Sequence, residues 1–431
     1  MLQTLRNAWK IPELRKKMLY TLLLLVIFRL GSYVPVPGLA PEAVKQMLGG
    51  FSEGMQGLLN NFSGGALERG SIFAMSISPY INASIILQLL TVAIPALERL
   101  AKEGAEGQKK IASYTRYLTV ILGFLQATGL YFGLRYSLVG GPSFMNFVVL
   151  TLSFTAGTAF LMWLGEQITE KGIGNGISLL IFTGIVSRGP AMIQSLRSTL
   201  VTDQGMNIQS LVTLIAVLVV AVLAIAFVVL MNDAERRIPV QYAKRVVGRK
   251  MYGGQSTHIP IKVSMAGVMP IIFAVSIMSF PQTINMFING ETMPTGFWGT
   301  VLSLFQQTHP FYITVYFLLI VFFTYFYTAI QFNPIEVSNN MKKNGGFVPG
   351  IRPGKPTSDF ISRILSKITL FGSLFLAVIA IFPILMGVFM PSLAGVAIGG
   401  TSLLIMVGVA LETVKQMESQ MLMRHYKGFL E

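Results

Sequence analysis

The stretch that decides the fold is "SGGALERGSIFAMSISPYINASIILQLL", residues 63–90. Its second half, from Ser71, is apolar enough to lie in lipid, although it carries polar side chains such as Asn82 and Gln88. Its first half is charged, rich in glycine and too short to cross a bilayer. Pro79 removes one helical hydrogen bond, so we predict a loose segment followed directly by a kinked helix, with Ser78 and Asn82 satisfying the freed backbone groups.

The composition of the whole chain is that of an integral membrane protein. Of its 431 residues, 53% are hydrophobic and only 12% are charged. A helix needs about 20 mostly apolar residues to span the hydrocarbon core, and an open sheet edge is not tolerated there. We therefore predict ten membrane helices, and the first is too long and lacks the cleavage site of a signal peptide. They lie near 18–34, 71–92, 112–134, 144–164, 175–196, 210–231, 264–289, 311–331, 367–390 and 398–417.

The positive charges predict how the chain is oriented. The formal net charge is +15, and Lys and Arg gather in the N-terminal tail, in the loops after the second, sixth and eighth predicted spans, and in the C-terminal tail. The opposite loops hold few of them. Basic loops stay on the cytoplasmic side of a membrane, so we expect both termini to be cytoplasmic, which an even number of spans requires. Ten spans also allow two inverted halves of five, residues 1–200 and 201–431.

Two of the basic loops, 232–263 and 332–366, are longer than topology requires. Each carries turn signals, "YGGQSTHIP" in the first and "NGGFVPGIRPGKPTS" in the second, and "KRVVGRKMY" predicts a short strand or hairpin. Attraction to anionic lipid, about 1 kcal/mol per basic residue, explains the charge but not the length. Long ordered loops usually serve a function, so we favour a docking surface for a cytoplasmic partner over the lipid interpretation.

Reactive groups are scarce. The chain has no cysteine, which excludes disulfides and thiolate chemistry, and its three histidines (His258, His309 and His425) lie outside the predicted spans. No catalytic motif appears, so we predict neither enzymatic activity, nor a cofactor, nor a bound metal. Arg29 and Arg116 are the main charges inside the spans. Arg29 fits an ion relay less well than a snorkelling side chain or a helix-packing partner, so an ion- or proton-coupled transporter remains the alternative.

Branched aliphatic residues recur on two of the predicted helices. Ile77, Ile81 and Ile85 are four residues apart in the second span, and Ile177 and Ile181 repeat this spacing after "GIGNG". Ordinary packing or lipid contact explains any single isoleucine in a membrane helix. A ring of such side chains, however, would also form a narrow, dewetted constriction that excludes ions and can still deform.

Eight motifs then point to one family. "FSGGALERGSIFA", "PYINASIILQLLTV", "KKIASYTRYLT", "FLMWLGEQITEKGIGNGISLLIF", "QSTHIPIKVSMAGVMP", "FYTAIQFNPIE", "FVPGIRPGKPT" and "GGTSLLI" occur in this order from Phe62 to Ile405. In sequence and order they resemble the SecY family, the channel-forming subunits of the bacterial Sec protein translocase. The resemblance implies a polytopic, all-α fold of ten helices in a two-half clamshell, with an hourglass pore, a lateral gate and a small plug helix.

The resemblance also assigns residues to these parts. The pore ring it implies is Ile77, Ile81, Ile177, Ile181, Ile272 and Ile405. The plug it implies, about 57–70, includes Asn60, Phe62, Ser63, Gly64, Gly65, Leu67, Glu68 and Arg69, hinged by glycines. The lateral gate it implies is Gln88, Ser264 and the weaker candidate Thr91, where many relatives have asparagine in place of Ser264. The docking residues it implies are Arg236, Arg237, Lys244, Arg245, Arg249, Lys250, Arg352 and Lys355.

The partners follow from the resemblance as well. It implies a complex with SecE and commonly SecG in the bacterial plasma membrane, with the SecA ATPase or the ribosome docking on the basic loops. Signal sequences and unfolded preproteins would be the substrates, lipid would border the gate, and nucleic-acid sequence would not be read. Since no Walker A motif occurs in the chain, energy must come from a partner or from translation.

Overall fold

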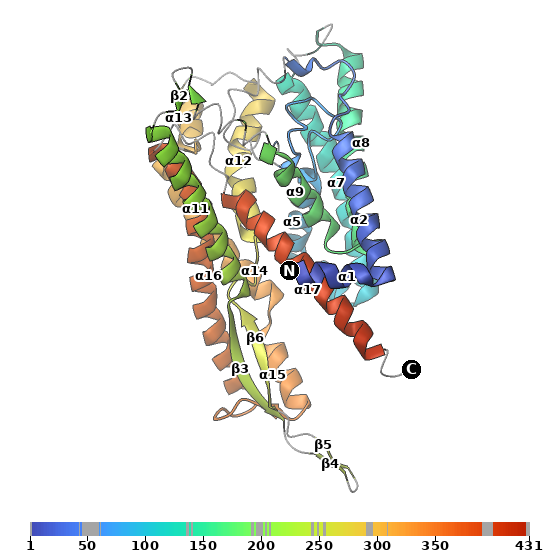
Figure 1. The fold of residues 1–431 in the computed structure, drawn as a ribbon, viewed down its shortest axis with the longest axis vertical. Helices are drawn as coiled ribbons and strands as arrows, with labels where there is room; N and C mark the ends of the chain where they lie inside the picture. Colours follow the sequence, from blue (N-terminus) through green and yellow to red (C-terminus); the bar gives the residue numbers. More distant parts are fainter. Residues whose placement is uncertain are drawn as a thin grey trace.

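The computed structural model is helix-rich (Figure 1). It describes residues 2–42, 44, 60, 62–134, 138, 141–190, 194, 201–202, 205–206, 208–242, 245–247, 250–252, 256–289, 296–307, 309–389 and 400–427. Each of the ten predicted span ranges overlaps one helix. These helices are α2 (Pro12–Gly31), α5 (Ser78–Ala93), α7 (Ala105–Leu134), α8 (Phe144–Lys171), α9 (Gly176–Ser187), α11 (Ile208–Asp233), α12 (Met269–Asn289), α14 (Pro310–Gln331), α16 (Lys355–Phe389) and α17 (Gly400–Lys427).

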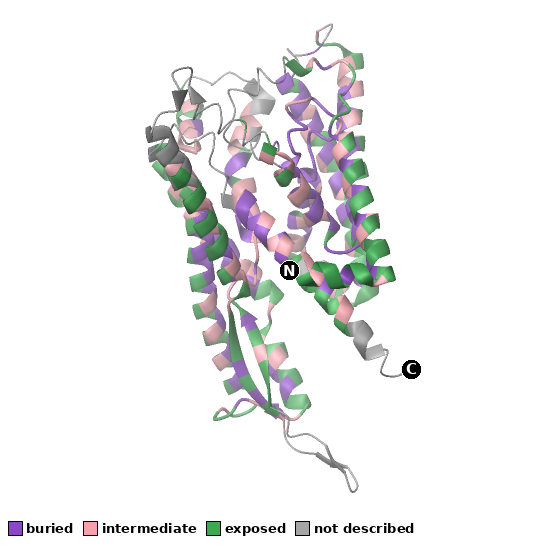
Figure 2. Cartoon of the chain, viewed as in Figure 1, coloured by how far each residue is buried: buried purple, intermediate pink, exposed green. Residues whose placement is uncertain are grey.

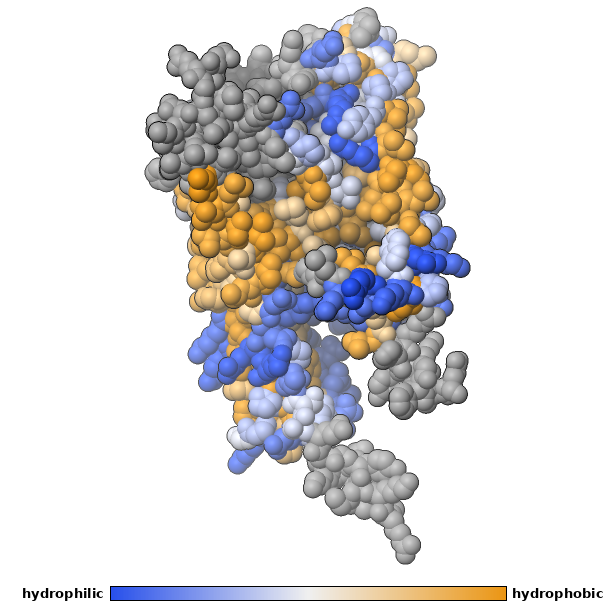
Figure 3. All heavy atoms as spheres, viewed as in Figure 1, coloured by the Kyte–Doolittle hydropathy of each residue, from blue (hydrophilic) through white to orange (hydrophobic). Residues whose placement is uncertain are grey.

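Length and apolar composition mark part of this set as membrane spans. Within the described residues, 4 helices are long and apolar enough to cross a bilayer, or 5 if the bent pair of α5 and α6 (Pro95–Lys102) counts as one. Large apolar side chains such as Leu22, Leu230 and Phe371 are more than half exposed. Figure 2 shows exposed faces along α2 and α11. Figure 3 shows an apolar band across the middle of the view, where these helices lie. These exposed apolar faces suit lipid rather than water.

The helices form two groups in space (Figure 1). Helices α2, α5, α7, α8 and α9 pack together, while α12, α14 and α16 pack side by side in the second group with α11 beside them. The groups meet where α12 packs against α7 and where α17 packs against α9, α11 and α16. The short N-terminal helix α1 (Leu2–Lys10) lies on α2 and α17, and a small apolar cluster that includes Ala8 and Met417 is buried there.

The predicted kink at Pro79 is wrong. Helix α5 begins at Ser78, with Ile77 as its N-cap, so Pro79 lies in the first turn, where a backbone N–H has no intrahelical acceptor to lose. The residues before it form successive turns instead of helix. The bend comes later, because Ile94 is extended (φ −109°, ψ 113°) ahead of Pro95, and α6 leaves α5 at 102°.

Sheets interrupt the predicted all-α fold at the loops. Strands β3 (Glu235–Tyr242) and β6 (Ser256–Lys262) pair antiparallel with Glu235 opposite Lys262, and β7 (Gly346–Phe347) adds to β3. The hairpin expected in "KRVVGRKMY" is confirmed as β4 (Arg245–Val247) paired with β5 (Lys250–Tyr252). The remaining elements are β1 (Val201–Thr202), β2 (Gly205–Met206), α13 (Phe297–Leu304) and α15 (Pro334–Lys343).

The two long basic loops therefore form one ordered body. Ile238 and Val240 of β3 and Ile261 of β6 are buried with Met341 of α15 and Ile361 of α16 in a separate apolar cluster. Together they project beyond the apolar band, and their surface is largely hydrophilic (Figures 1 and 3). Over the residues of these loops that the structure describes, which leave out 243–244, 248–249 and 253–255, the prediction of structured fingers is confirmed.

Candidate functional site

Five of the six isoleucines of the predicted ring line one cavity. It has a volume of about 810 Å³ and is bordered by Ile81 of α5, Ile177 and Ile181 of α9, Ile272 of α12 and Ile405 of α17. These residues are up to 324 positions apart in the chain, and they converge because their four helices surround the same space. Branched side chains from several helices can narrow such a passage without a rigid wall.

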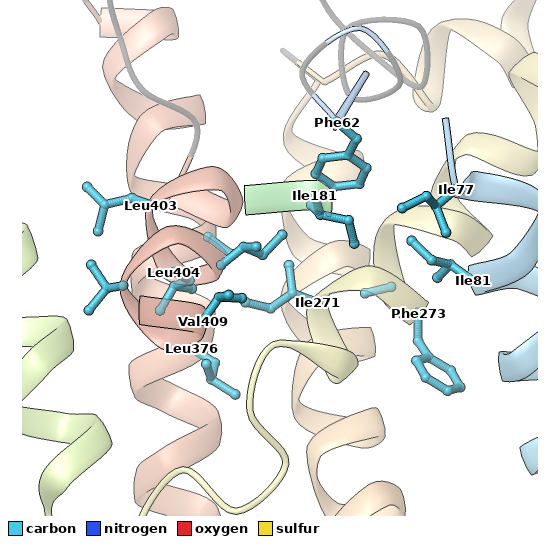
Figure 4. Packing of buried hydrophobic residues seen from close by; sticks show 14 of the residues in the cluster. Phe62, Ile77, Ile81, Ile181, Ile271, Phe273, Leu376, Leu403, Leu404 and Val409 are labelled. Atoms are coloured by element: carbon cyan, nitrogen blue, oxygen red, sulfur yellow. The ribbon is translucent and has the colours of Figure 1, made fainter. Parts of the chain in front are cut away.

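The sixth isoleucine lies beside this cavity. Ile77, at the N-cap of α5, is 1% exposed and packs in the apolar cluster that also contains Ile81, Ile181 and Ile405. Figure 4 shows Ile77 and Ile81 facing Ile181, with Phe62 above them. The six predicted residues are thus brought together in one cluster, and their role in a pore stays a prediction.

The segment predicted to be the plug occupies the inside of the helix group. Phe62, Ser63, Ala66 and Leu67 are buried, and the carbonyl oxygen of Phe62 lies so close to Gly184 of α9 that a Cβ there would be 2.0 Å from it. We keep the name plug segment for residues 57–70, of which 57–59 and 61 lie outside the described residues. The segment therefore rests against α9 and the isoleucine cluster at once.

The implied plug helix is not seen over 63–70, where the chain forms turns and bends. Gly64, Gly65 and Gly70 adopt left-handed backbone angles (φ 65°, 81° and 57°), which a continuous right-handed helix does not contain. The hinge role assigned to these three glycines stays a prediction. Ser76 is also left-handed (φ 51°), and its hydroxyl donates to the carbonyl of Phe62 over 3.3 Å.

Charged side chains surround the outer part of the plug segment. Arg29 of α2 donates through Nη1 to the carbonyl of Gly64 (3.1 Å) and to Oγ of Ser187 (3.0 Å), and through Nη2 to the hydroxyl of Tyr33 (2.9 Å). The helix-packing interpretation of Arg29 is confirmed. Arg116, another charge inside the spans, forms an ion pair with Glu166 of α8 (2.7 Å).

Within the plug segment, the side-chain amide of Asn60 and the carboxylate of Glu68 make polar contacts. Asn60 donates through Nδ2 to the carboxylate of Glu68, which also lies 3.6 Å from Nη2 of Arg188. Arg69 donates to the carbonyl of Gly64 at the longer distance of 3.4 Å. These contacts place the predicted plug residues among partners from their own segment and from the end of α9.

Two of the three predicted gate residues border the isoleucine-lined cavity. Gln88 and Ser264 both line the cavity, while the hydroxyl of Thr91 donates to the carbonyl of Gln88 within α5 (2.7 Å). Oε1 of Gln88 is buried without a partner among the described residues. The structure thus brings two of the three predicted gate residues to one space, and Thr91 bonds only locally.

A different polar pair joins α5 and α12. Ser276 of α12 donates to Oδ1 of Asn82 of α5 over 3.3 Å. The predicted role of Asn82, which is to satisfy backbone groups freed by a kink, is wrong because α5 begins at Ser78 and no kink occurs at Pro79. Ser276 was not singled out from the sequence. Each of the two apolar spans carries several polar side chains, so the sequence held no signal that would have paired these two.

Six of the eight predicted docking residues belong to the part of the chain that the structure describes. Arg236 and Arg237 of β3, and Arg352 and Lys355 before and at the start of α16, are exposed. Arg237 pairs with Glu235 (2.7 Å). Arg245 and Lys250 belong to β4 and β5, whereas Lys244 and Arg249 lie outside the described residues. The exposed arginines are thus on the hydrophilic body formed by the two loops.

Comparison with known proteins agrees with this geometry. The family model described as SecY matches residues 71–414. "Protein translocase subunit SecY" of Halalkalibacterium halodurans is 48% identical over 100% of both chains, and that of Thermotoga maritima is 47% identical over 100% of this chain and 98% of its own.

Solved structures agree on the fold. One described as "The structure of a protein conducting channel" covers 94% of this chain and 91% of its own, with a TM-score of 0.63 and 18% identity. Another, "Sec61 in the Canine ribosome-channel complex from the endoplasmic reticulum", has a TM-score of 0.60 and 17% identity, with the same 94% and 91% coverage. Full-length identity near one half and a shared fold leave one assignment: the chain belongs to the SecY family of protein translocase subunits.

Proposed function

We propose that the chain is the channel through which unfolded secretory polypeptides cross the bacterial plasma membrane. The observation that carries this proposal is a cavity that isoleucines from four helices line, beside which the plug segment of the same chain is seated. In this proposal the ten helices span the membrane as two halves, residues 1–200 and 201–431. Both termini and the body formed by loops 232–263 and 332–366 face the cytoplasm.

The resting channel excludes ions because its narrowest part is apolar. Phe62 of the plug segment and the isoleucines Ile77, Ile81 and Ile181 share one cluster, so water finds no polar partner there. A translocating polypeptide carries side chains of many sizes, and a ring of independent side chains on separate helices adapts to each. The plug segment must leave before the chain passes, and its glycines lower the cost of that rearrangement.

Transmembrane segments would leave the channel sideways, between α5 and α12. Among the described residues, one side-chain hydrogen bond, from Ser276 to Asn82, joins these helices, whereas α12 packs more extensively against α7 and α14. One neutral hydrogen bond stabilises by about 1 kcal/mol. An apolar signal sequence can replace that contact by burying its own side chains against the two helices.

Energy and partners come from outside the chain. We propose that SecA or the ribosome docks on the loop body through Arg236, Arg237, Arg352 and Lys355, and that SecE and SecG complete the complex. The likeness to a channel described in a ribosome–channel complex supports ribosome docking. The coupled-transporter alternative finds no support in the relatives, which are protein translocase subunits.

The test is reconstitution. The chain, purified with SecE and SecG and placed in lipid vesicles, should protect a preprotein from added protease when SecA and ATP are present. The same preprotein without its signal sequence should remain digestible. Solute uptake by vesicles that lack SecA, without any protein translocation, would establish the transporter alternative instead.

A further inference from the structure

We propose that Arg29 is a positioning residue that latches the plug segment in its seat, and that it sets how often the resting channel opens. The inference rests on the proposed function, since it assumes that the plug segment closes the channel. It adds a residue outside the plug segment and outside the predicted gate. Its basis is a set of hydrogen bonds centred on one guanidinium group.

The guanidinium of Arg29 joins three parts of the molecule. Nη1 donates to the carbonyl of Gly64 in the plug segment (3.1 Å) and to Oγ of Ser187 at the end of α9 (3.0 Å). Nη2 donates to the hydroxyl of Tyr33, and the guanidinium carbon lies 4.8 Å from the centre of the Tyr33 ring. Hydrogen bonds from a charged donor are stronger than neutral ones, and the planar fork of arginine can serve several acceptors at once.

Only one of these three partners belongs to the part that must move. Ser187 is the last residue of α9, and its hydroxyl donates to the carbonyl of Gly184 in the same helix. Tyr33 lies two residues after the end of α2. Both stay in place when the plug segment leaves, so the open state loses the bond to Gly64 and keeps the others. A contact present in one state and absent in the other shifts the equilibrium between them. Because the guanidinium remains held by Tyr33 and Ser187, it is ready to capture the Gly64 carbonyl again.

Neighbouring groups cannot replace this contact. Arg69 also lies over the Tyr33 ring (4.3 Å), but its bond to Gly64 is longer, at 3.4 Å, and its buried Nη1 has no hydrogen-bond partner among the described residues. It belongs to the plug segment itself and would leave with it. Glu68 and Arg188 are 3.6 Å apart with each side chain more than one third exposed, and exposed ion pairs contribute little.

The first measurement is ion conductance of the purified complex in planar bilayers. Arg29→Met should raise the open fraction about tenfold, the change that corresponds to 1.4 kcal/mol. Arg29→Lys should raise it less, since a single ammonium keeps the charge but not the fork. The matched control is Arg116→Met, which removes an arginine from α7 that pairs with Glu166 away from the plug segment. It should leave the conductance unchanged.

The second measurement reports the position of the plug segment directly. The chain has no cysteine, so Leu67→Cys provides a single thiol at a site that is 1% exposed. A water-soluble maleimide should label it about tenfold faster in the Arg29→Met background than in the parent. The Arg116→Met background should label at the parental rate. A general loosening of the helix bundle would accelerate labelling in both backgrounds and would overturn the latch.

Deletion of residues 60–70 separates this inference from the proposed function. If the deletion itself causes no ion leak, the plug role in the proposed function is wrong. If the deletion leaks while Arg29→Met and Arg29→Lys stay sealed and Leu67→Cys stays protected, the latch alone is wrong. Should Arg29→Met fail to accumulate in membranes, Ser187→Ala and Arg29→Lys decide the question. Parental conductance in both would reject the latch, and a leak from either at normal abundance would support it.

Discussion

Ile405 is a buried side chain for which a packing role and a pore role predict different effects of mutation. It is 2% exposed, it packs with Ile77 and Ile181, and it borders the cavity of about 810 Å³. A residue that only packs the bundle and a residue that closes a pore would have the same burial. The two roles differ in what a polar replacement meets, which is a packed core in the first case and a passage in the second.

Ile405→Asn should therefore leave a folded channel that leaks ions. A buried polar group without a partner costs about 1 to 3 kcal/mol, but a side chain that faces the cavity can bind water instead. We expect near-normal abundance in membranes, raised ion conductance in planar bilayers, and passage of preproteins with defective signal sequences. The leak should grow when residues 60–70 are deleted. Low abundance without an ion leak would show that Ile405 only packs the helix bundle and does not close a pore.

Asn82→Leu should relax substrate selection at the gate. It removes the acceptor for Ser276 and leaves that hydroxyl facing an apolar side chain, which favours the open state by about 1 kcal/mol. Export of preproteins with defective signal sequences should rise, as measured by protease protection in vesicles. Ser264→Leu should also relax selection if Ser264 acts in the gate. Unchanged discrimination in both variants would place signal recognition elsewhere.

At the scale of elements, the start of α5 decides how the plug segment is attached. Residues 71–77 form turns and the helix begins at Ser78, so the plug segment is linked to α5 by a non-helical connection and not by a continuous kinked helix. If the plug segment moves as proposed, no helical hydrogen bond of α5 has to break, and α5 can keep its contacts with α7 and α8.

Pro79→Ala tests this arrangement. Because Pro79 lies in the first turn of α5, its replacement restores no missing helical bond and should lower the free energy of unfolding by about 1 kcal/mol or less, through a more flexible unfolded chain. Thermal unfolding of the purified complex in detergent gives the comparison. Pro281 lies inside α12 and serves as the control, since Pro281→Ala can restore a backbone bond there. A marked stabilisation by Pro79→Ala would instead indicate an interior kink.

At the scale of the whole molecule, the hydrophilic body and the membrane part are built on the same helices. Helix α16 runs from Lys355, where it packs against α15, to Phe389, and it also contacts α12, α14 and α17. β3 follows directly after α11, and β6 leads toward α12. A force applied to the body by a partner is therefore applied to helices that border the cavity.

Arg352→Glu should uncouple the motor without unfolding the channel. Arg352 is exposed, and its backbone carbonyl, not its side chain, accepts from Thr357 (2.8 Å), so the substitution leaves the local turn intact. We expect loss of SecA- and ATP-driven export with normal abundance and unchanged ion conductance. Arg237→Glu is the comparison within the proposed docking residues, and it should lower export less because Arg237 is already paired with Glu235. Export at the parental rate in Arg352→Glu would remove this residue from partner coupling.

The sequence by itself determined the class of the protein, the approximate ranges of ten helices and the structured basic loops, through apolar length, charge bias, turn signals and the resemblance of eight motifs to one family. Spacing along one helix marked Ile77, Ile81, Ile177 and Ile181, whereas Ile272 and Ile405 came from the resemblance alone. Only the tertiary structure decided where α5 begins, that Asn82 meets Ser276, and that Arg29 holds the carbonyl of Gly64. The latter two contacts join residues 194 and 35 positions apart, and which partners meet depends on how whole helices pack. No pattern within a single span contains that information.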